Sequence, residues 1–304
     1  MMRACGVSQF GDEVMSLTLS DPPGPNRAQI VMAVEAAGVG GWDRLVGTGA
    51  WNVGLRPPAA LGVEGFGRVV GVGEGVADFQ LGDAVLTHDA PLPGGSGFWS
   101  ERVLVSSTSL APCPMGLEPN MAGALPVAGL TARQSLDDVA LEPGQALLVT
   151  GGASPTGSLV VQLAALAGIA VTATASAGNT ERLMALGAHH VVDYHDMDWP
   201  KRTGAPFDGA VVVAPGTSED ALALLRDEGR LCSLTSDAPQ GERGIASHDL
   251  YVQPNSAQLA NLAVMMRDGL LAFDLETVSL SEGSTAFDLV AKGRAGGKKF
   301  VLRP

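Results

Sequence analysis

The stretch 146–168, ALLVTGGASPTGSLVVQLAALAG, constrains the fold of this chain more than any other. Residues 146–150 form a short apolar run without alternation, which is typical of a strand buried on both faces of a parallel sheet. Glycines then break the run. From Ser158 apolar residues recur at helical spacing until Gly168, which suits a helix C-terminal cap. The unpaired N–H groups at the start of this helix, together with its dipole, predict a site for a phosphate anion.

The glycine turn matches a dinucleotide-binding loop only in part. Such a loop carries glycine at the tight turn, at the pyrophosphate and at the contact between helix and strand. Here the spacing gives Gly151, Ser154 and Gly157, and Pro155 has no N–H to donate. The segments that follow alternate with short links: an apolar strand at 169–175, a helix at 180–186 and a strand at 191–193. This alternation predicts a doubly wound parallel sheet of the Rossmann type.

The 304 residues, 46% of them hydrophobic, predict a soluble globular protein of about two domains. Residues 1 to about 118 are β-rich, and their dense glycines fit the bulges of a partly closed barrel. We place the boundary near Pro119, where the composition becomes helical. The expected strands are 14–19, 29–34, 62–72, 84–87, 209–214, 229–234 and 299–302, and the expected helices include 121–125, 129–136, 218–226 and 258–266. The last strand could return to the first domain.

Charge and cysteine content narrow the function classes. With 19 basic against 32 acidic residues the net charge is −13, which opposes binding to nucleic acid or to an anionic membrane. No apolar run is long enough to span a membrane, and the N-terminus lacks the apolar core of a signal peptide, so we expect a cytoplasmic protein. The three widely spaced cysteines indicate buried thiols rather than disulfides or a metal cluster. A small molecule is the expected partner.

Short blocks along nearly the whole chain resemble the medium-chain dehydrogenase/reductase superfamily, and within it the zinc-independent quinone oxidoreductase branch. The order and spacing of these blocks carry the resemblance: Phe10-Gly11, Ala36-Ala37-Gly38-Val39 with Asp43, Leu61 to Gly67, Leu81 to Val85, Gly129-Leu130-Thr131-Ala132, Leu186-Gly187-Ala188 and Asp227 to Leu231. The resemblance implies a GroES-like catalytic domain built from 1–118 and 268–304. It also implies a Rossmann domain over 119–267 and a cleft where NADPH meets the substrate.

The residues themselves argue against a catalytic zinc site, because such a site needs about three converging Cys, His or carboxylate side chains. Zinc-dependent relatives carry cysteine where this chain has Gly40 or Gly41, and histidine where it has Val63. The five histidines, 88, 189, 190, 195 and 248, show no ligand spacing, and we interpret them as surface or loop residues.

The residues that follow the second strand of the Rossmann domain indicate the cofactor preference, because an acid at that place would bind the ribose 2′-OH of NAD. No acid lies there. Ser176 and Asn179 could donate to a 2′-phosphate and Arg182 would supply charge, although Arg182 could equally be a solvated helix residue. NADPH is therefore the predicted cofactor. Its predicted contacts, with those that the resemblance implies, are Thr131, Gly151, Gly152, Ser154, Pro155, Thr156, Gly157, Ser176, Asn179, Arg182 and Lys299.

The catalytic candidates are Asp43 and Thr131. Quinone oxidoreductases of this kind often carry an asparagine and a tyrosine at places that hold Gly40 and Leu45 here, so the usual polar groups are missing. Asp43 could relay a proton, or it could cap a helix or pair with Arg44. Thr131 matches a family position beside the nicotinamide, or it could bond its own helix backbone.

The predicted function is zinc-independent transfer of hydride from NADPH to a quinone or an α,β-unsaturated carbonyl. One alternative is a trans-acting enoyl reductase of a biosynthetic pathway, and another is a non-catalytic NADPH-binding member of the fold. The physiological substrate is not specified by the sequence. Residues 249–253 are expected to form an edge strand of the Rossmann sheet, and because relatives pair such edges, we expect a homodimer.

Overall fold

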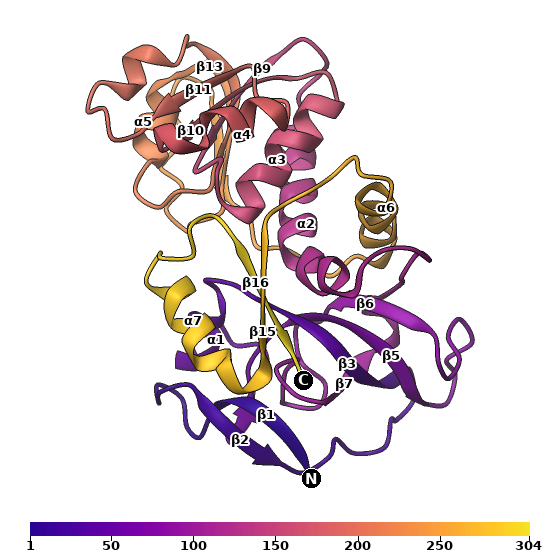
Figure 1. Ribbon diagram of the computed structural model, residues 1–304. Helices are drawn as coiled ribbons and strands as arrows, with labels where there is room; N and C mark the ends of the chain where they lie inside the picture. Colours follow the sequence, from indigo (N-terminus) through magenta and orange to yellow (C-terminus); the bar gives the residue numbers. More distant parts are fainter. The chain divides into compact units, whose positions relative to one another are not determined.

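The computed structural model describes residues 1–304 and divides into two compact units (Figure 1). Unit 1 comprises 1–130, 253–270 and 274–304, and unit 2 comprises 131–252 and 271–273. The division lies inside helix α2 (Pro119–Val139), about 12 residues after the predicted boundary. Helix α6 (Ser256–Arg267) packs against a strand of unit 1, β8, and therefore belongs to that unit.

Unit 2 is a six-stranded parallel sheet in the order β11-β10-β9-β12-β13-β14. Its strands are β9 (Ala146–Thr150), β10 (Ala170–Ala175), β11 (His190–Asp193), β12 (Phe207–Val212), β13 (Leu225–Ser233) and β14 (Ala246–Asp249). The chain starts in the middle at β9, winds outward to β11, then returns past β9 to β12. This is the order of a Rossmann sheet, and the predicted fold class is confirmed.

The helices of unit 2 pack on this sheet through apolar side chains. They are α3 (Pro155–Leu166), α4 (Thr180–Ala185), α5 (Ser218–Ala223), and the 3₁₀ turns η2 (Ala177–Asn179) and η3 (Trp199–Arg202). Helix α3 packs on β9 and β10, and α5 packs on β12 and β13. Around α5, a fully buried cluster includes Leu148, Phe207 and Leu231. Burial on both faces explains why these strands are apolar without alternation.

Unit 1 holds the GroES-like sheets. A seven-stranded sheet has the order β15-β16-β3-β5-β6-β8, with β7 paired to β3, and a second sheet has the order β2-β1-β4. The strands are β1 (Met2–Val7), β2 (Met15–Leu19), β3 (Gln29–Val39), β4 (Ala59–Ala60), β5 (Glu64–Val72), β6 (Ala84–His88), β7 (Arg102–Ser106), β8 (Leu110–Pro112), β15 (Leu275–Ser279) and β16 (Lys299–Arg303). The remaining elements are α1 (Asp43–Thr48), α7 (Gly283–Ala291), η1 (Ser107–Ser109) and η4 (Leu280–Glu282).

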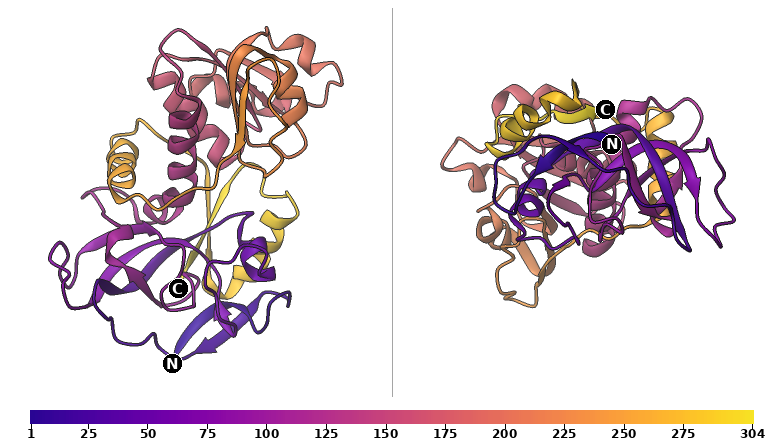
Figure 2. Two further views of the ribbon diagram at one scale, coloured as in Figure 1. Left: turned by 180° about the vertical axis from the view of Figure 1, so that it is seen from behind. Right: turned by 90° about the horizontal axis from the view of Figure 1, so that it is seen from below.

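The end of the chain returns to the first strands, as the sequence suggests. Strand β16 pairs antiparallel with β3, so that Phe300 faces Val39 and Leu302 faces Ala37. Figure 1 shows this yellow strand beside the indigo one, and Figure 2 shows that both termini lie in unit 1. The pairing places Lys299 at the end of β3, beside the segment that leads into α1.

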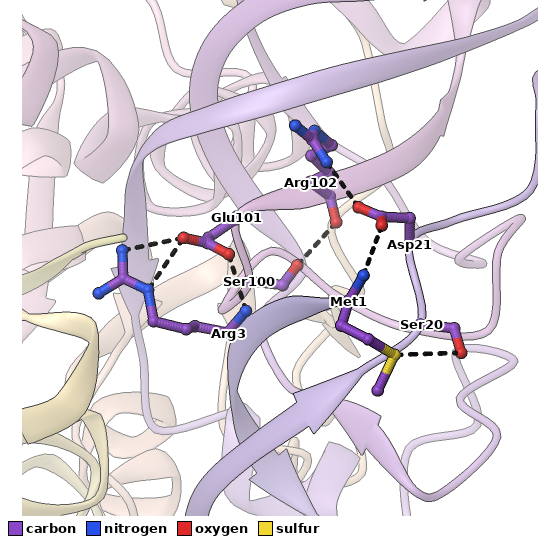
Figure 3. A network of polar contacts seen from close by, with 7 residues as sticks. All are labelled: Met1, Arg3, Ser20, Asp21, Ser100, Glu101 and Arg102. Carbon is purple, nitrogen blue, oxygen red and sulfur yellow. Dashed lines mark hydrogen bonds and ion pairs between the residues drawn. The ribbon is translucent and has the colours of Figure 1, made fainter.

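Charged contacts fasten the N-terminus to the same unit (Figure 3). The amino group of Met1 and the guanidinium of Arg102 both contact the Asp21 carboxylate, at 2.8 and 2.6 Å. Arg3 pairs with Glu101 at 2.9 Å. These side chains are largely exposed, so solvent screens the pairs and each contributes little to stability. These ion pairs hold β1 next to the start of β7, and they do not supply most of the stability of unit 1.

Several predicted boundaries differ from the structure, and the helices predicted at 121–125 and 129–136 are one helix, α2 (Pro119–Val139). Helix α3 begins at Pro155 rather than Ser158, because Ser154 caps it. Helix α5 ends at Ala223 rather than Arg226, because Leu225 already pairs with Phe207 in the sheet. The edge strand β14 covers 246–249 and not 249–253, since its residues pair in register with 230–233 of β13. None of the helices combines the length and the apolar character that crossing a membrane requires.

Candidate functional site

The two residues that depart from the dinucleotide fingerprint build the start of α3. The Ser154 hydroxyl accepts a hydrogen bond from the Gly157 amide at 3.0 Å, as an N-cap residue does. Pro155 occupies the first turn, where a missing N–H costs nothing and the fixed φ favours the helix. The sequence S-P-T-G is therefore a well-capped helix start, in which the Ser154 amide donates to the Gly151 carbonyl and the Gly157 amide donates to the Ser154 hydroxyl.

Close backbone packing explains the glycines of this loop. Gly151 has φ +68°, a conformation that favours glycine. A Cβ on Gly157 would lie 2.3 Å from the carbonyl oxygen of Gly151, and one on Gly152 would lie 2.8 Å from the Cβ of Ala173. The helix thus approaches the strand through glycine alone. This cradle fits the pyrophosphate of a dinucleotide, which needs a backbone surface free of side chains.

The loop lies where the strand order of the sheet reverses. Between β9 and β12, the Thr150 hydroxyl accepts from the Val213 amide at 3.2 Å and from the Thr217 hydroxyl at 2.9 Å. These bonds hold together the two loops that leave the carboxyl ends of β9 and β12. In doubly wound sheets a ligand binds at this switch point.

The residues predicted to select the cofactor lie together at the end of β10. Asn179 donates to the Ser176 hydroxyl at 2.9 Å, and Arg182 donates to the Asn179 side chain at 3.3 Å. Arg182 also donates to the carbonyl of Ala153 in the glycine loop at 2.7 Å. Arg182 is thus bent back to the loop rather than extended into solvent. The segment offers donors and one positive charge; it has no acid between Ser176 and Thr180, and Glu181 is exposed in the first turn of α4.

Unit 1 contains a buried ion pair beside β3. Lys299 Nζ lies 2.5 Å from Glu64 Oε1, and the two side chains are 2% and 0% exposed. The second oxygen of Glu64 accepts from the Val127 amide at 2.7 Å, directly after Pro126 interrupts the hydrogen-bond ladder of α2. Lys299 also lies 4.4 Å from the centroid of the Trp42 ring, in cation–π contact. The predicted cofactor residue Lys299 is therefore held by Glu64 and Trp42.

The candidate acid Asp43 is fully buried at the start of α1. Its Oδ2 accepts from the Gly40 amide at 2.8 Å, whereas Oδ1 has no hydrogen-bond partner of normal geometry. Burial raises the pKa of Asp43 to about 7, against the opposing effects of the Gly40 amide and the charge of Lys299. The side chain does not cap α1, and Arg44 is not its partner. Asp43 thus has the pKa of an acid that can give up a proton near neutral pH.

The interpretation of the five histidines as surface or loop residues is wrong for His88. It ends β6 and is fully buried. Its Nδ1 lies 3.0 Å from the carbonyl oxygen of Val63, so Nδ1 carries the proton, and the unpartnered Nε2 is an acceptor. Burial lowers its pKa. The signal that could have found it is the run Thr87-His88-Asp89, three polar residues ending a buried strand.

The other candidates are placed as follows. Thr131 is half-buried in α2, and Thr156 lies in the first turn of α3. Leu45 is half exposed on α1, and Val63, at the histidine position of zinc-dependent relatives, is fully buried. No group of three or more His, Cys, Asp or Glu side chains is placed to hold a metal ion. The cysteines are free, with Cys5 and Cys232 buried and Cys113 half-buried.

A glycine cradle at the switch point of a Rossmann sheet, in a chain with a GroES-like unit, defines the class of nucleotide-dependent oxidoreductases. Residues 26–115 match the family profile of the alcohol dehydrogenase GroES-like domain, and residues 186–301 match that of the zinc-binding dehydrogenase. The 2-methylene-furan-3-one reductase of Solanum lycopersicum is 30% identical over 319 residues, covering 100% of this chain and 79% of the relative. The chain therefore belongs to the medium-chain dehydrogenase/reductase superfamily.

Other matches agree with this membership. The structure of the quinone oxidoreductase from Coxiella burnetii has a TM-score of 0.88 and 26% identity, covering 100% of this chain and 99% of the other. The human synaptic vesicle membrane protein VAT-1 homolog is 34% identical over 204 residues, which are 66% of this chain and 51% of that protein. The matches to this protein and its rat and mouse counterparts span only about half of their length.

Proposed function

We propose that this protein transfers hydride from NADPH to the β-carbon of an α,β-unsaturated carbonyl or to a quinone, without zinc. The observation that carries the proposal is Asp43, a fully buried carboxyl group that accepts from the Gly40 amide and whose pKa burial raises to about 7. Reduction of a conjugated enone or a quinone requires a hydride and a proton, and spreads the developing negative charge over several atoms. A simple ketone would instead give a localised alkoxide, which needs a metal or a strong acid.

The cofactor assignment rests on unit 2. The capped start of α3 and the glycine cradle fit the pyrophosphate, and the linked side chains of Ser176, Asn179 and Arg182 fit a 2′-phosphate. When bound, the nicotinamide supplies the hydride and is oxidised to NADP⁺. We assign the nucleotide to the loop after β9 and the acceptor to the side chains around Asp43.

The choice of acceptor draws support from the relatives. The tomato protein is named for reduction of a 2-methylene-furan-3-one, a compound whose C=C bond is conjugated with a ketone. The structural relative from Coxiella burnetii is called a quinone oxidoreductase. Both acceptors leave the charge on a conjugated oxygen after hydride arrives. The common chemistry is thus conjugate reduction, whichever acceptor the protein uses in the cell.

A panel of acceptors tests the function. Purified protein is mixed with NADPH and, in turn, 1,4-quinones, enones and enoyl thioesters, while simple alcohols are offered with NADP⁺. We expect loss of reduced-nicotinamide absorbance with quinones or enones and little or no alcohol oxidation. Turnover confined to enoyl thioesters would favour the trans-acting enoyl reductase. Tight NADPH binding without any turnover would favour the non-catalytic member of the fold, and alcohol oxidation alone would refute the proposal.

The role of Asp43 is tested separately. If Asp43 delivers a proton, Asp43→Ala should lower turnover by about 10²-fold or more while the protein stays folded. The raised pKa sets the sign of the pH dependence: the acid is protonated below about pH 7, so wild-type turnover should fall as the pH rises through that value. Asp43→Asn should remove this pH step. Unchanged turnover in both variants would leave Asp43 with a structural role only.

A further inference from the structure

The segments that leave the carboxyl ends of β12 and β13 meet on one aspartate. Asp237 lies in the loop after β13. Its Oδ1 accepts from the hydroxyls of Ser218, Ser233 and Thr235, at 2.5, 2.9 and 2.6 Å. Its Oδ2 accepts from the Gly216 amide at 3.0 Å. Two of these donors follow β12 and two end or follow β13, so the carboxylate joins the two segments.

The same four bonds keep this carboxylate ionised. Desolvation raises the pKa of Asp237, but the hydroxyl and amide donors outweigh it and lower the pKa to about 2. Hydrogen bonds that are made to the charged form of an acid favour that form. Such charge-assisted bonds are roughly twice as strong as bonds between neutral groups. Asp237 is therefore a fixed anion at neutral pH that holds its donors firmly.

Further hydrogen bonds extend this contact to the neighbouring strands. The hydroxyl oxygens of Thr217 and Thr150 lie 2.9 Å apart, and Thr150 ends β9 directly before the glycine loop. On the other side, the residue after the aspartate, Ala238, donates through its amide to Asp249 Oδ1 of β14 at 3.0 Å. Bonded and adjacent residues therefore connect the carboxyl ends of β9, β12, β13 and β14.

The backbone beside the aspartate has a conformation that side chains disfavour. Ser236 has φ +59°, in the left-handed region. Residues other than glycine keep such a conformation only where the surrounding structure imposes it, and they cluster at functional sites. Thr235 and Asp237, on either side of Ser236, are bonded to each other at 2.6 Å and close this turn. The loop after β13 is thus held in a defined form at the ligand-binding edge of a parallel sheet.

The two halves of a dinucleotide occupy different parts of this edge. In a doubly wound sheet each half of the sheet binds one mononucleotide, and the dinucleotide crosses the crevice where the strand order reverses. The cofactor assignment above gives the pyrophosphate to the loop after β9. It gives the adenosine 2′-phosphate to Ser176 and Arg182, on the β10 side. The nicotinamide half then falls to the loops after β12 and β13, which Asp237 joins.

We propose that Asp237 is a positioning residue that holds the loops after β12 and β13 in the form that receives the nicotinamide half of the cofactor. This inference rests on the cofactor assignment of the proposed function and does not depend on the acceptor. Asp237 acts through the loops that it joins and not by contact with the reacting atoms. Without its carboxylate, the loops would have to be ordered when the cofactor binds, and that ordering costs affinity.

Asp237→Ala separates the two halves of the cofactor. The Kd of NADPH is measured by fluorescence titration. The Kd of 2′,5′-ADP, which carries the adenosine 2′-phosphate but no nicotinamide, is measured by calorimetry. We expect the variant to weaken NADPH about 10-fold and to change the Kd of 2′,5′-ADP by less than about 2-fold. Equal changes for both ligands would show a general structural role, and they or an unchanged Kd of NADPH would overturn the proposal.

Asp208→Ala is the matched control from the opposite edge of the same sheet. Asp208 Oδ2 accepts from the Ala146 amide at 2.6 Å, and Oδ1 pairs with Arg226 at 2.5 Å. This aspartate also joins neighbouring strands, but near the amino ends of β9, β12 and β13. Neither Kd should change in the folded variant. If Asp208→Ala weakened NADPH as much as Asp237→Ala does, any loosening of the sheet would suffice and the proposal would fail.

Asp237→Asn gives a conservative version of the test. Its oxygen can still accept from the hydroxyl donors, whereas its amide nitrogen cannot accept from Gly216. NADPH should therefore weaken by a smaller factor than in Asp237→Ala, again with 2′,5′-ADP unchanged. If Asp237→Ala does not fold, this variant decides by the same ratio of the two Kd changes. An asparagine variant that weakens NADPH more than alanine does would contradict the role of the carboxylate oxygens.

Turnover separates the role of Asp237 from the proposed function. If the wild type reduces no acceptor but only NADPH weakens in Asp237→Ala, the proposed function fails and the positioning role stands. If quinones or enones are reduced and Asp237→Ala binds NADPH as the wild type does, the proposed function stands and the positioning role fails. A wild type that prefers NADH would remove the NADPH assignment, and the ratio measured with NADH and 5′-AMP would then decide for Asp237.

Discussion

Lys299→Met should destabilise the protein strongly, because it leaves the Glu64 carboxylate buried without its cation. Both side chains are almost completely buried and lie 2.5 Å apart, so solvent screens the pair little. Removing one partner of a buried pair costs about 3 to 5 kcal/mol. The neighbouring Lys298 pairs with Glu276 at 2.8 Å with both side chains about half exposed. The matched control Lys298→Met should therefore cost far less, because solvent screens an exposed pair.

The pH dependence distinguishes a lost ion pair from lost packing. Burial raises the pKa of Glu64, and the charge of Lys299 lowers it, so the variant should raise it further. A folded-state pKa above the unfolded value of 4.5 means that the folded state binds the extra proton. Stability then falls as the pH rises from the unfolded value through the folded one. The loss in Lys299→Met should be smaller at about pH 5 than at about pH 8.

Urea denaturation of both lysine variants measures these losses. Adding Glu64→Gln to Lys299→Met should recover most of the free energy of unfolding, since no charge remains buried and the amide oxygen can still accept from Val127. Equal losses in Lys298→Met and Lys299→Met, or a loss in Lys299→Met that does not change with pH, would refute the reasoning.

The remaining predictions concern the cofactor, the metal and assembly. Gly157→Val should abolish NADPH binding in a fluorescence titration, because its Cβ would lie 2.3 Å from the Gly151 carbonyl oxygen; retained affinity would contradict the assigned loop. Arg182→Gln should weaken NADPH about 10-fold or more and leave NADH nearly unchanged, as loss of a charged phosphate contact implies; equal effects on both would remove the 2′-phosphate assignment. Elemental analysis should find no stoichiometric zinc, and chelators should not alter turnover. Light scattering should report a homodimer through the edge strand β14, and a monomer at micromolar concentration would argue against it.

The sequence by itself determines the order of the elements and the nucleotide loop. Residues 146–168 predict β9, the turn and α3 because strand burial, glycine freedom and helical spacing are local properties. That no acid lies between Ser176 and Thr180, directly after β10, is likewise readable without a structure. The role of Ser154 and Pro155 is also local, and the error at the start of α3 came from treating them as departures from a fingerprint rather than as a helix cap.

Only the tertiary structure shows which buried polar side chains of unit 1 lie together and what surrounds them. Lys299 and Glu64 are 235 residues apart in sequence, and they meet because β16 pairs with β3. The pKa of Asp43, the burial of His88 and the unpartnered N–H of Trp42 depend on which neighbours exclude water. The place of the Trp42 ring over Gly40 depends on a turn whose hydrogen bonds no periodicity records. Spacing specifies which face a residue lies on, whereas charge, pKa and unpaired donors are set by the side chains that surround it.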